Sequence, residues 1–320
     1  MRGPYGECRH LSESTAIAGP APEQRGTWTT RLRVMFMRSE ALRGYTLLSP
    51  TLLVMAFSMC VPFAIMVVMS FWSQHGFDFD TTFSLSNYFE AIEAPIYKAL
   101  LIRSLWISGS CAIATVVISY PMAYYVAFHV HKRKMLWIIL MTLPFWTSYL
   151  LRVFAWKVVL GYNGAINSGL KAIGLIEQPL EFLLYSPTAV VITLAHAWAA
   201  FAILPIYVSL EKIDRSLLEA AADLGDGPVV RFLRVTLPLS LPGVIAAMLM
   251  IFIPTVGDYV TPALVGGPDG IMMANMIQAH FGKVNNWPMG AALAVSMMIT
   301  VTMIALVYIW VTRKATERIA

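Results

Sequence analysis

Long stretches without Asp, Glu, Lys or Arg constrain this chain more than any other feature. A helix needs roughly 20 uncharged residues to cross a hydrocarbon core of about 30 Å, where the backbone N–H and C=O groups must bond within the segment itself. The composition, 58% hydrophobic and 13% charged, excludes an ordinary soluble domain. Six charge-poor intervals reach or approach that length: Arg43 to Asp78, Arg103 to Lys132, Lys134 to Arg152, Glu181 to Glu211, Arg234 to Asp258 and Lys283 to Arg313.

The sequence therefore predicts an all-α membrane protein with six transmembrane helices. We place them at about residues 45–72, 104–129, 135–157, 186–209, 240–263 and 289–311. The third interval is the shortest, so its helix is expected to carry Arg152 and Lys157 close to one interface, where long basic side chains can extend to water.

The distribution of Lys and Arg beside the spans predicts the orientation, because basic loops are retained in the cytoplasm. One side has only Lys98, Lys171 and Lys283 as its main basic residues. Both termini and the loop 210–239 are accordingly expected in the cytoplasm. The basic residues assigned to the cytoplasmic side are Arg31, Arg33, Arg38, Arg43, Lys132, Arg133, Lys134, Lys212, Arg215, Arg231, Arg234, Arg313, Lys314 and Arg318.

Three segments follow from these boundaries: a flexible cytoplasmic tail over 1–44, a transmembrane domain over 45–312 and a short cytoplasmic tail over 313–320. The first apolar run begins only near Tyr45 and lacks a small-residue cleavage pattern, which argues against a removable signal peptide. Met35 and Met37 leave a later start of translation open. The three cysteines, Cys8, Cys60 and Cys111, are too scattered to predict a disulfide framework or a metal site.

The cytoplasmic loop carries a compact set of helix signals. Ser216 and Glu219 have the spacing of a capping box, and Gly225 suits the left-handed residue after a helix, so we expect a helix over 217–224. Pro228 suits the first turn of a second short helix, and Pro238 the entry to the fifth span. A surface loop whose residues merely cap its own short helix would explain each of these signals when it is taken singly. The alanines at 220–222 leave room for another protein to approach.

Taken together, these residues resemble the signature loop of ABC-importer permeases. The pattern is Glu-Ala-Ala, three residues, Gly, nine residues, then an aliphatic residue, one residue and Leu-Pro. One soft departure is Val235, where isoleucine is usual. In that family the loop is the helix that couples the permease to an ATPase, and the type I importer fold is implied. The residues matched to this role are Glu219, Ala220, Ala221, Gly225, Val235, Leu237 and Pro238.

Further runs resemble the spermidine/putrescine permease branch, so that about residues 40–312 are covered. This branch is also similar to importers of opines, iron chelates and other small solutes, including anions, so the solute stays open. The matching segments are Leu-Pro-Phe-Trp-Thr-Ser at 143–148 with Arg152, Ala155, Trp156, Lys157, Asn163, Gly164 and Asn167, Phe252 to Gly267, Asn275, Gln278, and Trp287 to Ala292.

The resemblance implies a subunit of the bacterial inner membrane that moves a solute without enzymatic activity of its own. Its implied partners are an ABC ATPase dimer in the cytoplasm, a second permease subunit, identical or homologous, a periplasmic solute-binding protein and membrane lipid, with no nucleic acid. ATP would be used by the ATPase, and this chain is expected to bind no cofactor or metal. Its Gly-Lys pair at 282–283 is followed by Val284 and lacks the pattern of a phosphate-binding loop.

Four residues are candidates for the solute pathway: Asp258, Tyr259, Trp146 and Trp156. Prolines and Gly257 around Asp258 predict an irregular outer third of the fifth span. Counting about 1.5 Å per residue from Ser240 places Asp258 roughly 27 Å along that span, near the outer interface. An ordinary interface carboxylate and a contact to a cationic solute are both compatible with this place, and aromatic belts provide the alternative for the three aromatic residues. Arg152 is expected to extend to water or to pair, for instance with Asp258.

Two other functional classes fit the sequence less well. A secondary transporter would bury ionisable residues near the midplane and repeat its halves, and neither feature is evident. An intramembrane hydrolase needs a nucleophile, a base and oxyanion donors together, and His196 stands without a Gly-x-Ser-x-Gly run. Acidic residues outnumber the lysines of the outer loops, which weakly favours a cationic solute. They are Asp78, Asp80, Glu90, Glu93, Glu177, Glu181 and Asp269.

Overall fold

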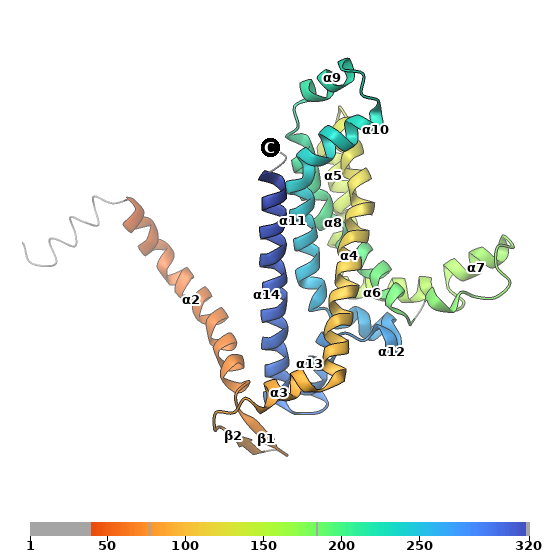
Figure 1. Cartoon of the computed structure of the whole chain (residues 1–320). Helices are drawn as coiled ribbons and strands as arrows, with labels where there is room; N and C mark the ends of the chain where they lie inside the picture. The colour runs from red at the N-terminus through yellow and green to blue at the C-terminus, as the bar shows by residue number, and fades with distance from the viewer. Residues whose placement is uncertain (1–39, 77, 184, 318–320) are drawn as a thin grey trace, which may run out of the picture. The chain divides into compact units, whose positions relative to one another are not determined.

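The computed structural model describes residues 40–76, 78–183 and 185–317, and these residues are mostly helical (Figure 1). The chain divides into two compact units, Met1–Pro62 and Phe63–Ala320, and the division falls within helix α2 (Glu40–Met69). The predicted N-terminal tail up to residue 39, with Cys8, Met35 and Met37, lies outside the described residues, as do residues 318–320 of the C-terminal tail. Residues 40–44 belong to α2.

After α2 the second unit contains one small hairpin and a series of helices. The elements are β1 (Ser73–His75), β2 (Asp78–Asp80), α3 (Ser86–Glu93), α4 (Pro95–Phe128), α5 (Lys134–Thr142), η1 (Leu143–Trp146), α6 (Tyr149–Leu160), α7 (Ala165–Ala172), η2 (Glu181–Leu183), α8 (Pro187–Glu211), α9 (Arg215–Asp223), α10 (Pro228–Arg231), η3 (Phe232–Thr236), α11 (Leu237–Val256), η4 (Pro262–Gly266), α12 (Gly267–Gly270), α13 (Met273–Gly282) and α14 (Trp287–Glu317). The segments η1 and η2 are 3₁₀ helices, and η3 and η4 are π-helical.

Five helical segments are long and apolar enough to span a membrane, which agrees with five of the six predicted spans. Two of them begin well before the predicted residues, at Pro95 rather than 104 and at Pro228 rather than 240, because a charged residue such as Lys98 or Arg103 does not stop a helix that has left the apolar layer. The segments are Gly44–Met69, Pro95–Phe128, Pro187–Glu211, Pro228–Val256 and Trp287–Lys314.

The third predicted span, 135–157, is not one straight helix. It consists of Lys134–Trp146 and Tyr149–Ala172, which bend by 83° at a short break. Pro144 is the second residue of the 3₁₀ turn η1, and Thr147 then adopts an extended backbone with ψ 153°. The Thr147 hydroxyl donates to the carbonyl of Pro144 at 2.7 Å and thereby satisfies a freed acceptor. With the bent pair counted as one span, the described residues provide the predicted six.

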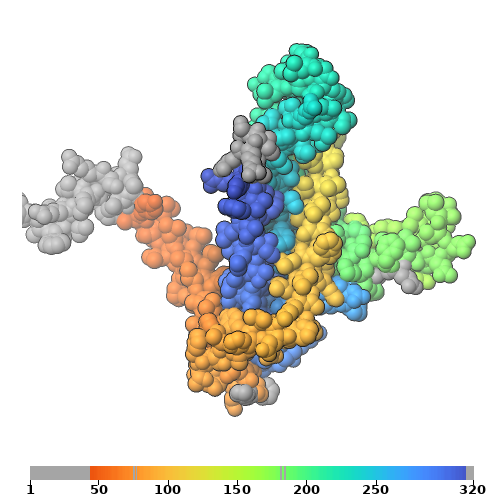
Figure 2. All heavy atoms as spheres, viewed as in Figure 1, coloured from red at the N-terminus to blue at the C-terminus, as the bar shows by residue number. Residues whose placement is uncertain are grey.

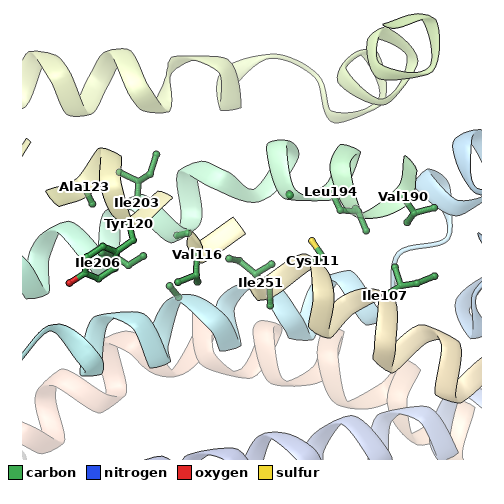
Figure 3. Packing of buried hydrophobic residues seen from close by; sticks show 14 of the residues in the cluster. Ile107, Cys111, Val116, Tyr120, Ala123, Val190, Leu194, Ile203, Ile206 and Ile251 are labelled. Carbon is green, nitrogen blue, oxygen red and sulfur yellow. The ribbon is translucent and has the colours of Figure 1, made fainter. Parts of the chain in front are cut away.

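The core of the second unit lies where α4, α8 and α11 pack together (Figure 3). Small side chains such as Ala123 of α4 let the helices approach, and Ile251 of α11 fills the space between them. Tyr120 and Ser240 join α4 to α11 by a hydroxyl–hydroxyl hydrogen bond of 2.8 Å. Such bonds satisfy polar groups that have no access to water, so the core is held in one register.

The two ends of this helix bundle are built differently. At one end the β1–β2 hairpin, antiparallel with Gln74 opposite Phe79, is tied to the start of α14. The Gln74 side chain donates to the carbonyl of Asn285 at 2.7 Å and accepts from the backbone N–H of Trp287 at 3.1 Å. At the other end lie α9 and the C-terminal ends of α4, α8 and α14 (Figure 1). The predicted cytoplasmic loop therefore shares its side of the bundle with the C-terminal end of α14.

Candidate functional site

The helix of the predicted cytoplasmic loop, α9, begins two residues before the predicted position. Its cap is Asp214, whose Oδ1 accepts the backbone N–H of Ser216 at 2.9 Å, and the capping box of Ser216 and Glu219 does not form. Asp214 prevails because it lies in an extended conformation, with ψ 126°, next to the free N–H groups of the first turn. The same N–H group holds the pKa of the Asp214 carboxyl below its ordinary value.

The end of α9 follows the prediction. Gly225 has φ +89°, a left-handed conformation that glycine adopts without a steric penalty. Its N–H donates to the carbonyl of Ala222 at 2.9 Å, and the N–H of Asp226 donates to that of Ala221 at 3.0 Å. These are the two bonds of a Schellman motif, which closes the helix and reverses the chain.

The second predicted helix of the loop is not a separate element. Pro228 does begin a helix, as expected, but α10 continues through η3 into α11 without a break, so Pro228–Val256 forms one helical segment. Val235 lies in the π-helical turn and Leu237 packs against the core. Arg234 pairs with Asp226 at 3.3 Å and links this segment to the turn after α9.

The exposed face of α9 is small and partly apolar. Glu219 and Ala220 are exposed, whereas Ala221 is buried, so the three matched residues of this helix do not share one surface. Leu224, at the end of α9, is 87% exposed. It was not singled out from the sequence, although its position directly before the closing Gly225 marks it as a residue at the tip of the loop. Figure 2 shows the segment 215–231 projecting beyond the ends of α4 and α14.

A second candidate site surrounds the break after α11. The helix ends at Val256 rather than at the predicted residue 263, which confirms the irregular outer third of that span. Pro254 and Gly257 lie at this end. A pocket of about 310 Å³ opens beside it, between α6, α8 and the break; it is lined by Phe145, Tyr149, Arg152, Ala197, Trp198, Pro254 and Asp258.

Asp258 is held by three hydrogen bonds. Its Oδ1 accepts the backbone N–H groups of Val260 at 2.8 Å and Thr261 at 3.4 Å, and the hydroxyl of Tyr149 donates to Oδ2. The Thr261 hydroxyl lies 2.6 Å from that of Tyr149. Asp258 thus starts the next helical turn, and it also presents a carboxylate to the pocket.

Arg152 does not form the ion pair with Asp258 that the sequence suggested. Its guanidinium donates to the carbonyl of Ala197 at 3.1 Å and lies over the ring of Phe145 at 5.2 Å. Among the described residues its buried Nε has no hydrogen-bond partner, and neither has the indole N–H of Trp198. Both side chains line the pocket of Asp258.

The four candidate pathway residues do not converge on one cavity. Trp156 contacts His196 edge to face at 5.3 Å and lines a neighbouring cavity of about 380 Å³, which Arg152 and Phe145 also line. Tyr259 lines a third cavity of about 460 Å³ between α11, α13 and α14. Trp146 is 86% exposed and lines none of these three cavities. Sequence reasoning missed Tyr149, because a single tyrosine beside a span gives no pattern.

No group of three or more His, Cys, Asp or Glu side chains gathers to hold a metal ion in the part of the chain that the structure describes. The described cysteines, Cys60 and Cys111, are free thiols.

Comparison with known families gives a match over nearly the whole chain. Residues 41–317 match the family described as binding-protein-dependent transport system inner membrane component. The spermidine/putrescine transport system permease protein PotB of Escherichia coli (strain K12) is 35% identical over 226 residues, which cover 71% of this chain and 82% of that protein. The corresponding protein of Haemophilus influenzae is 34% identical over 253 residues, 79% of this chain and 88% of its own.

A third relative and two solved structures extend the comparison. The inner membrane ABC transporter permease protein YdcU of Escherichia coli is 34% identical over 235 residues, 70% of this chain and 74% of that protein. A bacterial ABC transporter for alginate has a similar fold, with a TM-score of 0.66 at 15% identity over 89% of this chain and 99% of the other. The structure of an alginate transporter in complex with a periplasmic protein gives 0.69 at 16% identity over 90% and 99%.

The solved structures share the fold, and the family match over residues 41–317 covers all the membrane-spanning segments and the loop 210–239. This chain belongs to the inner-membrane components of binding-protein-dependent transport systems, and it is a multi-pass ABC-importer permease subunit.

Proposed function

We propose that this permease subunit imports a polyamine such as spermidine or putrescine. The observation that supports this most is the similarity over some seven tenths of the chain to permeases named for spermidine and putrescine transport. The pocket at the break after α11 agrees with a cationic solute, because Asp258 presents a carboxylate there and Phe145, Tyr149 and Trp198 offer aromatic rings. Among the candidate pathway residues, Asp258 is the one that we expect to contact the solute most directly, followed by Tyr259 and Trp156.

The transport system that we propose has four further parts. A second permease, identical or homologous, completes the pathway, and a solute-binding protein delivers the polyamine from the periplasm. Two ABC ATPase subunits in the cytoplasm hydrolyse ATP, so this chain needs no cofactor of its own. The termini and α9 face the cytoplasm. The similarity in fold to an alginate transporter that binds a periplasmic protein supports the delivery step.

The segment 215–231 is the proposed contact with the ATPase. Its rigidity comes from the Asp214 cap, the Schellman motif at Gly225 and the Asp226–Arg234 ion pair. Ala220 leaves room for a partner, and Leu224 offers an exposed apolar side chain at the tip. A rigid projection transmits force, whereas a flexible one would absorb it.

The contact is tested by enlarging Ala220. In the Ala220→Trp variant the indole would occupy the space meant for the partner, and we expect the ATPase to associate about 30-fold more weakly, a loss of about 2 kcal/mol that is typical of a blocked interface centre. The measurement is co-purification of the ATPase with the tagged permease, together with uptake of radiolabelled spermidine by the complete system.

The matched control is Ala165→Trp at the exposed start of α7, which makes the same exchange away from the loop. Both variants must insert into the membrane at the wild-type level. Normal ATPase binding and uptake by Ala220→Trp would refute the proposed contact. A wild-type importer that ignores spermidine and putrescine but accumulates an anion or a metal chelate would refute the proposed solute.

A further inference from the structure

The pocket at the break after α11 contains two opposite charges that do not pair. Asp258 and Arg152 both line this volume of about 310 Å³, yet no ion pair joins them. Ionisable groups at membrane depth normally pair or serve a function, because an isolated charge is costly there. Asp258 therefore keeps a charge that a cationic occupant can neutralise, and Arg152 lies in the same pocket as that occupant.

The carboxylate keeps one position free for a ligand. An ionised carboxylate has about four acceptor sites, and three are used by Val260, Thr261 and Tyr149. The three donors are neutral, so they orient the carboxylate without cancelling its charge. No Lys, Arg or His side chain of the described residues lies within ion-pairing distance of it. The remaining site on Oδ2 suits one ammonium group.

The contacts of the Arg152 guanidinium lie on α8 and η1, away from Asp258. Its bond to the carbonyl of Ala197 anchors it to α8, and the ring of Phe145 lies against the guanidinium. Trp198 of α8, whose buried indole N–H has no hydrogen-bond partner among the described residues, lines the same pocket. An ammonium bound at Asp258 therefore experiences a standing repulsion from this side.

We propose that Arg152 sets the affinity of the pathway for its cation: Asp258 binds one ammonium of the solute, and Arg152 weakens that binding enough for release. The inference rests on the proposed polyamine import. A transport site must bind well enough for entry and weakly enough for exit, and a fixed charge near a binding carboxylate achieves this without blocking the path. Tyr149 is a positioning residue, since its hydroxyl donates to Oδ2 of the Asp258 carboxylate.

The test compares two neutral variants of similar shape in the assembled importer. Asp258→Asn keeps Oδ1 as an acceptor for Val260 and removes the charge, and Arg152→Gln removes the opposing charge. We expect equilibrium binding of radiolabelled spermidine to the receptor-free importer in lipid nanodiscs to weaken roughly tenfold in Asp258→Asn and to tighten roughly tenfold in Arg152→Gln. Spermidine turnover with saturating receptor should fall in both, by weak binding in the first and slow release in the second.

Lys157→Gln is the matched control, because it removes a basic charge from the same helix, and Lys157 lines none of the three cavities described above. Unchanged binding and turnover in Arg152→Gln would overturn the inference. Weaker spermidine binding in Arg152→Gln with Asp258→Asn unaffected would also overturn it and would assign the pocket to an acceptor-bearing solute. If the wild-type importer transports no spermidine, the proposed function fails first; if it does, the variants decide the role of Arg152.

Discussion

At the scale of single residues, the packing of α11 against α8 depends on one glycine. A Cβ atom at Gly243 would lie 2.5 Å from the carbonyl oxygen of Pro205 and 2.5 Å from Cβ of Ser209. Neither atom can move without moving the backbone of α8. The close approach brings Ser240, one turn earlier on α11, into the core, where it bonds Tyr120 of α4.

We therefore expect Gly243→Ala to lower the free energy of unfolding by about 1–3 kcal/mol, the usual cost of overpacking a close helix contact. Thermal unfolding of the purified full chain in detergent measures the change. Gly109→Ala on α4 is the control, because its added methyl group meets nothing within 4 Å and should leave stability unchanged or raise it by up to about 1 kcal/mol. Equal behaviour of the two variants would contradict the close packing of α11 on α8.

The sequence indicated Asp258 but neither its hydrogen bonds nor the place of Arg152. Glycine and proline around Asp258 foretell a helix break, because their backbone preferences act locally. The bond from Tyr149 joins residues 109 positions apart, and no local preference encodes such a contact. The suggested pairing of Arg152 with Asp258 failed for the same reason: Ala197 accepts a hydrogen bond from the guanidinium, and the two residues come together only through the packing of α6 on α8.

At the scale of elements, α9 shows a competition between two possible caps that lie two residues apart. The sequence favoured Ser216 with Glu219, whereas the structure uses Asp214. Both assignments satisfy known capping patterns, and the extended backbone at Asp214 decides between them. The start of a helix is therefore less predictable than its glycine end, which was found at the expected residue.

The Asp214 cap predicts a dependence on pH. Because the folded-state pKa of its carboxyl is lowered by the N–H of Ser216, the cap stabilises α9 fully above the ordinary pKa of 3.8, and this contribution is lost as the pH falls through the folded value. Hydrogen–deuterium exchange of peptides covering 212–224 should show the start of α9 opening over that acidic range.

Two substitutions distinguish the rival caps at neutral pH. Asp214→Ala should speed amide exchange in the first turn of α9, because the N–H of Ser216 then loses its acceptor. Ser216→Ala should leave the exchange unchanged. The reverse pattern would restore the capping box as the true start of the helix.

The third span illustrates a limit of reasoning from charge intervals. Counting uncharged residues predicted one helix over 135–157, but such a count does not reveal the direction of the helix axis. The chain bends by 83° at the break between Trp146 and Tyr149, which follows Pro144 within that interval. The proline was visible in the sequence. Whether it kinks a helix or ends one depends on whether neighbouring elements accept the new direction, and that is a property of the whole fold.

At the scale of the whole molecule, the second unit has one end with α9 and one end with the hairpin and α3 (Figure 1). The basic residues predict that the α9 end faces the cytoplasm. Leu224 is 87% exposed at the first end and Phe83 is 74% exposed near the second. These two positions report the orientation without disturbing the core.

Single cysteines at these positions, in a chain whose three native cysteines are replaced, should respond oppositely to a membrane-impermeant maleimide. In intact spheroplasts of cells that lack the ATPase we expect labelling of Phe83→Cys and protection of Leu224→Cys, and after lysis both should be labelled. Labelling of Leu224→Cys from outside would reverse the predicted orientation and place the Glu-Ala-Ala loop out of reach of a cytoplasmic ATPase.

The unbroken helical segment Pro228–Val256 connects the two candidate sites, so that a movement of one end is transmitted to the other. Its 29 residues extend about 44 Å, with the turn after α9 at one end and the break that carries Asp258 directly beyond the other. A tilt of about 5° around one end would displace the opposite end by about 4 Å over that length, more than the length of a hydrogen bond. Because Tyr149 of α6 holds Asp258 outside this helix, such a stroke would stretch that bond first and reshape the pocket around its cation.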